Sequence, residues 1–86
     1  GSEVNNALTQ VQVARGKTEL RDGQITSLET AVRSTQLLMK HGNSTYLEVL
    51  TAQQSLLSAQ LTQIADRFDE IQGIINLYQA LGGGRE

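Results

Sequence analysis

The 86-residue sequence contains no cysteine, no proline and no tryptophan. Without cysteine the chain cannot form a disulfide framework, a thiolate zinc site or a cysteine nucleophile. The absence of proline removes a common helix breaker and favours long uninterrupted helices. Aromatic residues make up only 3% of the chain and hydrophobic residues 38%. These fractions are low for a chain that has to form a globular hydrophobic core on its own.

Charge is sparse and nearly balanced. The formal net charge is −2 and no run of lysine or arginine occurs, so we expect no nucleic-acid partner. No apolar stretch approaches the ~20 residues that a membrane-spanning helix needs. Residues 1–2, Gly-Ser, resemble the scar that a protease leaves when it removes a tag. We therefore interpret the chain as a candidate excerpt from a longer protein.

Two long segments flank a single break. Residues 3–41 and 46–81 both place apolar side chains at alternating spacings of three and four, which predicts two long α-helices. The break at 42–45 predicts a turn, and residues 82–86 are a glycine-rich end. The predicted fold is all-α, an antiparallel two-helix coiled-coil hairpin.

Local signals at the break support this turn. Gly42 can adopt the left-handed conformation that closes a helix. Thr45 and Glu48 match a capping box, in which the Thr45 hydroxyl accepts from the Glu48 amide and the Glu48 carboxylate reaches back to the Thr45 amide. We therefore expect the second helix to start at Tyr46.

The apolar spacing predicts a packing seam on each helix. On the second helix it consists of Leu47, Leu50, Leu57, Leu61, Ile64, Phe68, Ile71, Ile75 and Tyr78, interrupted by the polar Gln54. On the first helix it consists of Val4, Ala7, Val11, Ala14, Thr18, Arg21, Ile25, Leu28, Val32, Thr35 and Met39.

Further apolar residues lie off both seams: Leu8, Val13, Leu20, Leu37, Leu38, Val49, Leu56, Ile74 and Leu81. A helix with two apolar faces has neighbours on two sides. We therefore expect the hairpin to belong to a larger bundle or a closed ring of helices. On its own, the hairpin is expected to self-associate, for example as a four-helix dimer.

Signatures of catalysis are missing from the sequence. A single histidine, His41, cannot form a two-histidine metal site, and no glycine-rich phosphate loop follows a strand. Asp66, Asp69 and Glu70 cluster on the second helix, but a solvated charged face explains them better than a catalytic pair does. We predict that the chain is not an enzyme and has no catalytic, metal-binding or cofactor-binding residues.

Three stretches resemble one known family. Residues 42–56 (GNSTYLEVLTAQQSL) are similar to the Gly-x-x-Ser/Thr-Tyr-Leu-Glu/Asp-Val-Leu-x-Ala-Gln-x-Ser-Leu motif of TolC-like outer-membrane efflux proteins. Residues 76–84 (NLYQALGGG) resemble that family's Leu-Tyr-x-Ala-Leu-Gly-Gly-Gly close, and residues 3–8 (EVNNAL) resemble its Glu-Val-x-x-Ala-Leu opening. The central motif is specific, whereas the helical remainder is not.

This resemblance implies a homotrimer with a β-barrel in the outer membrane and a long α-helical barrel in the periplasm of a Gram-negative bacterium. The chain would be the C-terminal periplasmic hairpin, with the Gly42 turn facing the inner membrane. At that end the helices narrow into an entrance gate, and a periplasmic adaptor protein docks to link the channel to an inner-membrane pump. The assembly would export drugs, metals or other toxic compounds.

Carried over by position, the resemblance implies that the tip residues serve adaptor docking and the gate: Gly42, Asn43, Ser44, Thr45, Tyr46 and Glu48. Met39 and Ser44 stand where some members place gating Tyr and Arg residues, so an ionic lock of that kind is not expected here. The alternative is a generic coiled-coil dimerisation hairpin with no transport role. Changes at residues 42–48 should distinguish the two, because a dimerisation hairpin would tolerate them.

Overall fold

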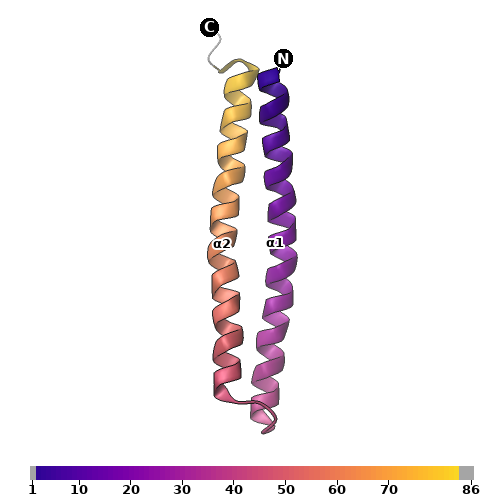
Figure 1. The fold of residues 1–86 in the computed structure, drawn as a ribbon, viewed down its shortest axis with the longest axis vertical. Helices are drawn as coiled ribbons and strands as arrows, with labels where there is room; N and C mark the ends of the chain where they lie inside the picture. Colours follow the sequence, from indigo (N-terminus) through magenta and orange to yellow (C-terminus); the bar gives the residue numbers. More distant parts are fainter. Residues whose placement is uncertain (1, 84–86) are drawn as a thin grey trace. The chain divides into compact units, whose positions relative to one another are not determined.

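A computed structural model describes residues 2–83 of the chain and contains two long helices joined by a short loop (Figure 1). Helix α1 covers Ser2–Lys40 and α2 covers Tyr46–Tyr78, followed by the π-helical turn η1, Gln79–Gly83. No strand occurs in the part of the chain that the structure describes. The prediction of an all-α helical hairpin is confirmed.

The element bounds differ slightly from those expected. Helix α1 begins at Ser2, one residue into the expected scar, and ends at Lys40 instead of residue 41. The α-helical part of α2 ends at Tyr78, and the chain continues as η1 with Gly82 at φ 126°. Residue 1 of the expected scar and residues 84–86 of the expected glycine-rich end lie outside the described residues.

The chain divides into two units, which are described separately. We call residues 21–63 the turn unit, and residues 1–20 with 64–86 the terminal unit. In the terminal unit Gln10 contacts Asn76 and Thr18 contacts Glu70. Residue 10 of α1 thus pairs with residue 76 of α2, and residue 18 pairs with residue 70. Because the residue numbers increase along α1 while those of their partners decrease along α2, the two helices are antiparallel in this unit.

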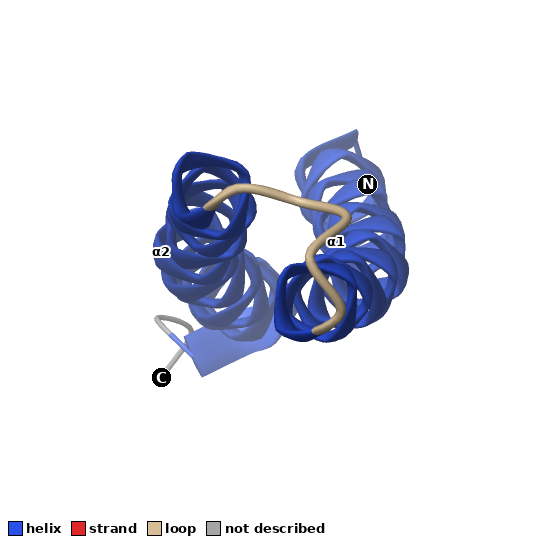
Figure 2. Ribbon diagram, turned by 90° about the horizontal axis from the view of Figure 1, so that it is seen from below, coloured by secondary structure: helices blue, strands red, loops and turns tan. Residues whose placement is uncertain are grey.

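A loop joins α1 to α2 in the turn unit (Figure 2), and its backbone hydrogen bonds end α1 in a Schellman motif. The Asn43 amide donates to the Leu38 carbonyl at 2.8 Å, and the Gly42 amide donates to the Met39 carbonyl at 3.0 Å. Gly42 has φ 80°, the left-handed conformation that glycine adopts without a steric penalty from Cβ. The loop therefore satisfies backbone carbonyls that the end of α1 would otherwise leave unpaired.

Residues on one side of α1 face α2 in each unit. The buried or half-buried positions on this side of α1 are Val4, Ala7, Val11, Ala14, Thr18, Arg21, Ile25, Leu28, Val32 and Thr35; Gly16 is also half-buried but lies on the opposite side of the helix. Ten of these are the seam expected from the sequence, and Ile25, Leu28 and Val32 are among them. Only Met39 of that expected seam is exposed, at the last turn of α1.

On α2 the structure corrects the choice of stripe. The positions that are buried or half-buried at heptad spacing form what we call the inner stripe: Val49, Ala52, Leu56, Ala59, Gln63, Asp66, Glu70, Gly73, Leu77 and Ala80. The expected seam residues are all exposed, and we call them the outer stripe: Leu47, Leu50, Leu57, Leu61, Ile64, Phe68, Ile71, Ile75 and Tyr78.

At Gly73 and Ala59 the physical reason is side-chain size. In the terminal unit Gly73 lies against Val11, where a Cβ on the glycine would be 3.4 Å from Val11 Cγ2. In the turn unit Ala59 is buried on the inner stripe. Small residues let two helix backbones approach closely, whereas the leucine and isoleucine side chains of the outer stripe would hold them apart.

Candidate functional site

The candidate site at the tip is the loop of the turn unit with the first turn of α2. The Thr45 hydroxyl accepts from the Glu48 amide at 3.2 Å, so the predicted N-cap is present. The second half of the predicted capping box is wrong. The Glu48 carboxylate accepts from the Ser44 hydroxyl at 2.7 Å instead of reaching the Thr45 amide.

These bonds fix the loop and leave most of its surface open. Gly42, Asn43, Thr45 and Glu48 are exposed, and Ser44 is half-buried. A loop whose backbone is held by a Schellman motif and an N-cap presents its side chains in one arrangement, which lowers the entropy lost when a partner binds.

Exposed apolar side chains surround this loop. We call them the apolar collar: Leu37, Leu38, Met39, Tyr46, Leu47 and Leu50, between 38% and 70% exposed. Contiguous exposed apolar surface marks interaction sites on proteins. The tip thus combines a polar, hydrogen-bonded loop with an exposed apolar collar.

The charges at the tip are few. Lys40 lies in the last turn of α1 and Glu48 in the first turn of α2, each at the helix end whose dipole favours it. His41 is exposed beside them, as expected for a solvated residue at a helix end. The charges near the tip thus suit the helix ends.

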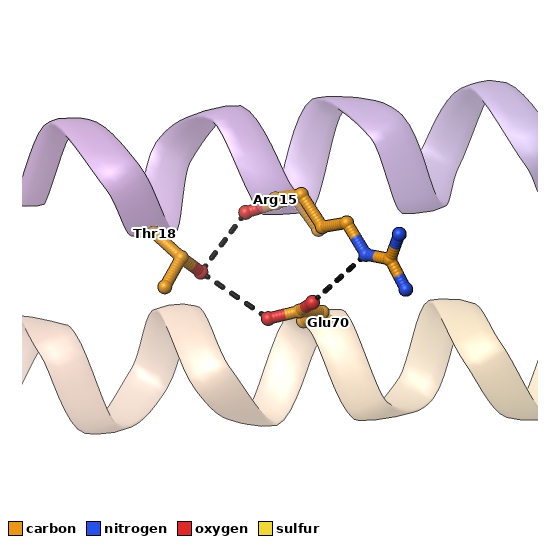
Figure 3. Close-up of polar contacts among 4 residues, drawn as sticks. Arg15, Thr18 and Glu70 are labelled. Atoms are coloured by element: carbon orange, nitrogen blue, oxygen red, sulfur yellow. Dashed lines mark hydrogen bonds and ion pairs between the residues drawn. The ribbon is translucent and has the colours of Figure 1, made fainter.

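The terminal unit contains polar contacts between α1 and α2 that the sequence did not reveal. Glu70 accepts from Arg15 Nε at 3.2 Å and from the Thr18 hydroxyl at 3.5 Å (Figure 3). Beside them, Lys17 Nζ lies 3.3 Å from an Asp69 carboxylate oxygen. The glutamate side chain is only 24% exposed, so this contact is partly shielded from solvent.

These contacts correct the expectation that Asp66, Asp69 and Glu70 form a solvated face. Asp66 is 5% exposed and lies on the inner stripe, and Glu70 is half-buried on the same stripe. Only Asp69 is exposed. The other two residues share the heptad register of Ala59 and Gly73, but the period alone does not reveal which of the two stripes faces α1.

The turn unit contains a shallow groove of about 620 Å³ beside the helix pair. Neutral polar side chains dominate its lining: Gln24, Gln54, Ser55, Ser58 and Thr62, with Arg21, Leu28 and Ala59. The Ser55 and Thr62 hydroxyls donate to backbone carbonyls one turn earlier. Gln54, which interrupts the predicted seam, therefore lies on an exposed polar surface.

Residues 2–83 bring together no group of His, Cys, Asp and Glu side chains that could hold a metal ion. Within those same residues, neither α1 nor α2 has the length and apolar character that a bilayer crossing requires. The features of the described chain that stand out are therefore surfaces: the tip and the outer stripe.

Comparison with known proteins identifies a family and several relatives of the chain. The family described as outer membrane efflux protein matches residues 1–83. The chain is 33% identical over 82 residues to the cation efflux system protein CusC of Escherichia coli K12, covering 95% of this chain and 18% of that protein. It is 46% identical over 43 residues to the solvent efflux pump outer membrane protein SrpC of Pseudomonas putida, covering 50% of this chain and 9% of that protein.

A third relative is the pyoverdine export outer membrane protein OpmQ of Pseudomonas putida KT2440, 30% identical over 83 residues, which are 96% of this chain and 18% of that protein. The chain thus spans about a fifth of the length of the curated relatives that it matches end to end. No solved structure gives a significant match.

Proposed function

Because the chain belongs to the outer membrane efflux protein family, we propose that it forms one helical hairpin of the periplasmic α-helical barrel of such a channel. In this proposal the loop at Gly42 lies at the end that faces the inner membrane. The hairpin is a structural element of the conduit and has no catalytic role. The observation that carries the proposal is the exposed tip, held by the Schellman motif and the Thr45 cap, within the motif of residues 42–56.

The two stripes of α2 support a barrel wall. Position 66 of the inner stripe and position 64 of the outer stripe are two residues apart. At 3.5 residues per turn, that offset separates the two faces by about 155°. A helix whose neighbours lie at such an angle belongs to a gently curved wall, and a closed ring with that angle has about 14 helices.

The apolar collar and the polar loop support docking at the tip. We propose that Gly42, Asn43, Ser44, Thr45, Tyr46 and Glu48 contact a periplasmic adaptor protein, which connects the channel to an inner-membrane pump. The full-length channel is proposed to be a homotrimer whose hairpin tips form the entrance gate. Small shifts of the two arms about the loop would then widen the ring.

The proposed cargo is a drug, a metal ion or another toxic compound. The names of the three relatives cover cations, solvents and pyoverdine, so the family alone does not select among these cargoes. The tip carries no metal-ligating cluster within residues 2–83 that would select one cargo.

The test uses the full-length channel in its host, with export measured as resistance to a transported toxic compound. Asn43→Arg and Tyr46→Ala should lower resistance toward that of a strain without the channel, because both side chains are exposed at the tip. The matched control is Gln12→Ala, an exposed residue on α1 far from the loop in sequence. The amount of channel in the outer membrane is measured for every variant.

Site-specific crosslinking from position 43 to the adaptor should succeed in the wild-type background. Normal resistance with both tip variants, together with no crosslink, would favour the alternative of a generic dimerisation hairpin. A loss of channel from the outer membrane would instead indicate a role of these residues in assembly, and would count against docking.

A further inference from the structure

The terminal unit has an apolar face that no part of the unit covers. Its share of the outer stripe consists of Ile64, Phe68, Ile71, Ile75 and Tyr78, which are between 44% and 69% exposed. Ile74 and Leu81 beside the stripe are 44% and 58% exposed. Several large apolar side chains exposed side by side mark an interaction surface on a protein.

The charge pattern around this face permits a second copy to bind it. In a heptad that places Ile64 and Phe68 at the core positions, the flanking positions are Ala65, Arg67, Gln72, Ile74, Gln79 and Leu81. Arg67 is the single charged residue among them. When two identical faces meet, the flanking positions therefore place no series of like charges opposite one another, and charge repulsion does not oppose the contact. Arg15, Lys17, Asp69 and Glu70 form contacts between α1 and α2 in the same unit.

The area is sufficient for a stable pair. Fully burying a large apolar side chain removes roughly 60–120 Å² from water, so these seven side chains supply on the order of 500 Å² per copy. Two copies reach about 1,000 Å² in total, near the lower limit of specific interfaces. The turn unit carries a similar exposed stripe on its part of α2, at Leu47, Leu50, Leu57 and Leu61.

The outer side of α1 in the terminal unit is a weaker candidate for the same contact. Its exposed apolar residues are Val13 and Leu20, and Gly16 between them has no atom within 4 Å of where its Cβ would lie. Contact between α2 of one copy and α1 of the next would bury fewer large side chains. It would also join copies head to tail, which produces rings or open chains instead of a closed pair.

We propose that the 86-residue chain forms a two-fold symmetric dimer in which the outer stripe of α2 packs against the same stripe of a second copy. The physical basis is the exposed stripe itself, and the proposal stands independently of the channel function. The dimer leaves the inner stripe and α1 in place, so the new apolar seam lies between the two α2 helices, and each α1 stays on the opposite face of its own α2.

The experiment uses the absence of cysteine from the sequence, because each introduced thiol then reports one position. Ile71→Cys and the control Leu20→Cys, whose native side chains are 57% and 78% exposed, are labelled with a maleimide across a range of protein concentrations. Sedimentation equilibrium of the unmodified chain gives the assembly state at each concentration. Circular dichroism checks that the variants keep their helical content.

We expect a monomer–dimer equilibrium. Where the dimer predominates, the thiol introduced at position 71 should be labelled at least tenfold more slowly, and the thiol introduced at position 20 should be labelled at an unchanged rate. A helical monomer up to about 1 mM would overturn the proposal. Slower labelling at both positions, with assemblies larger than two, would show head-to-tail contact and overturn it as well. Neither result bears on export by the full-length channel, so this test and that of the proposed function fail separately.

Discussion

Gly73 of α2 lies directly against Val11 of α1, and a Cβ at position 73 would be 3.4 Å from Val11 Cγ2 and 3.6 Å from its Cα. These are ordinary van der Waals distances, so the site has room for one methyl group and little more. Gly73→Ala should therefore raise the free energy of unfolding by up to about 1 kcal/mol, because alanine stabilises a helix interior relative to glycine.

Gly73→Leu should lower it by about 1–3 kcal/mol, since the longer side chain cannot fit without separating the helices. Urea denaturation at one fixed protein concentration measures both changes. Equal stability of the alanine and leucine variants would show that α1 and α2 do not pack closely at this position.

Gly42 differs from the helical glycines in its backbone. Its φ of 80° is unfavourable for a residue with a Cβ, so Gly42→Ala should destabilise the hairpin by about 1 kcal/mol. The matched control is Gly16→Ala in the interior of α1, where no atom lies within 4 Å of the added Cβ. That variant should gain about 0.5–1 kcal/mol in thermal or urea unfolding. The same sign for both variants would contradict the Schellman motif.

Thr45 caps α2 through its hydroxyl. Thr45→Ala removes the bond to the Glu48 amide and should reduce the free energy of unfolding by about 1 kcal/mol. Thr45→Ser keeps the hydroxyl and should restore most of this loss. Chemical denaturation of the three proteins compares them, and a serine variant as unstable as the alanine variant would show that the hydroxyl is not what stabilises the start of α2.

The contact between Arg15 and Glu70 can be measured by a double-mutant cycle. Arg15→Met and Glu70→Gln, alone and combined, should give a coupling energy of about 0.5–1 kcal/mol, because Glu70 is partly shielded. Lys17 and Asp69, whose side chains are 48% and 59% exposed, should couple more weakly. Both couplings should fall as salt is added. A stronger coupling for the exposed pair would contradict this assignment.

The sequence predicted the features that depend on local chemistry. Gly42 and Thr45 each have one conformation or bond that suits their side chains, and the loop is where they indicated. The seam of α1 was also found, because the other apolar residues of that helix, such as Val13, Leu20 and Leu37, form no continuous stripe at heptad spacing. On α2, however, two stripes share the same heptad period, and the period alone cannot assign one to α1.

The missed stripe depended on a relationship between distant residues. The sequence favoured the larger side chains, such as Phe68 and Ile71, whereas close approach of the helices required Gly73 and Ala59. Glu70 looked solvated for the same reason, since its partner Arg15 is 55 positions away in the chain. The burial of Glu70 could be predicted only once the register between α1 and α2 was known.

The spacing of the contacts between the helices suggests how the hairpin folds. The hydrogen bond from Gln63 to Asp22 closes 41 residues, that from Arg15 to Glu70 closes 55, and that from Asn76 to Gln10 closes 66. The entropy lost when a loop closes is smallest for the shortest loop, so contacts between α1 and α2 should form first near Gly42 and then spread toward the chain ends. In stopped-flow kinetics, Gly42→Ala should then mainly slow folding, whereas Gly73→Leu should mainly speed unfolding. Pairing of the two helices would thus begin at the loop.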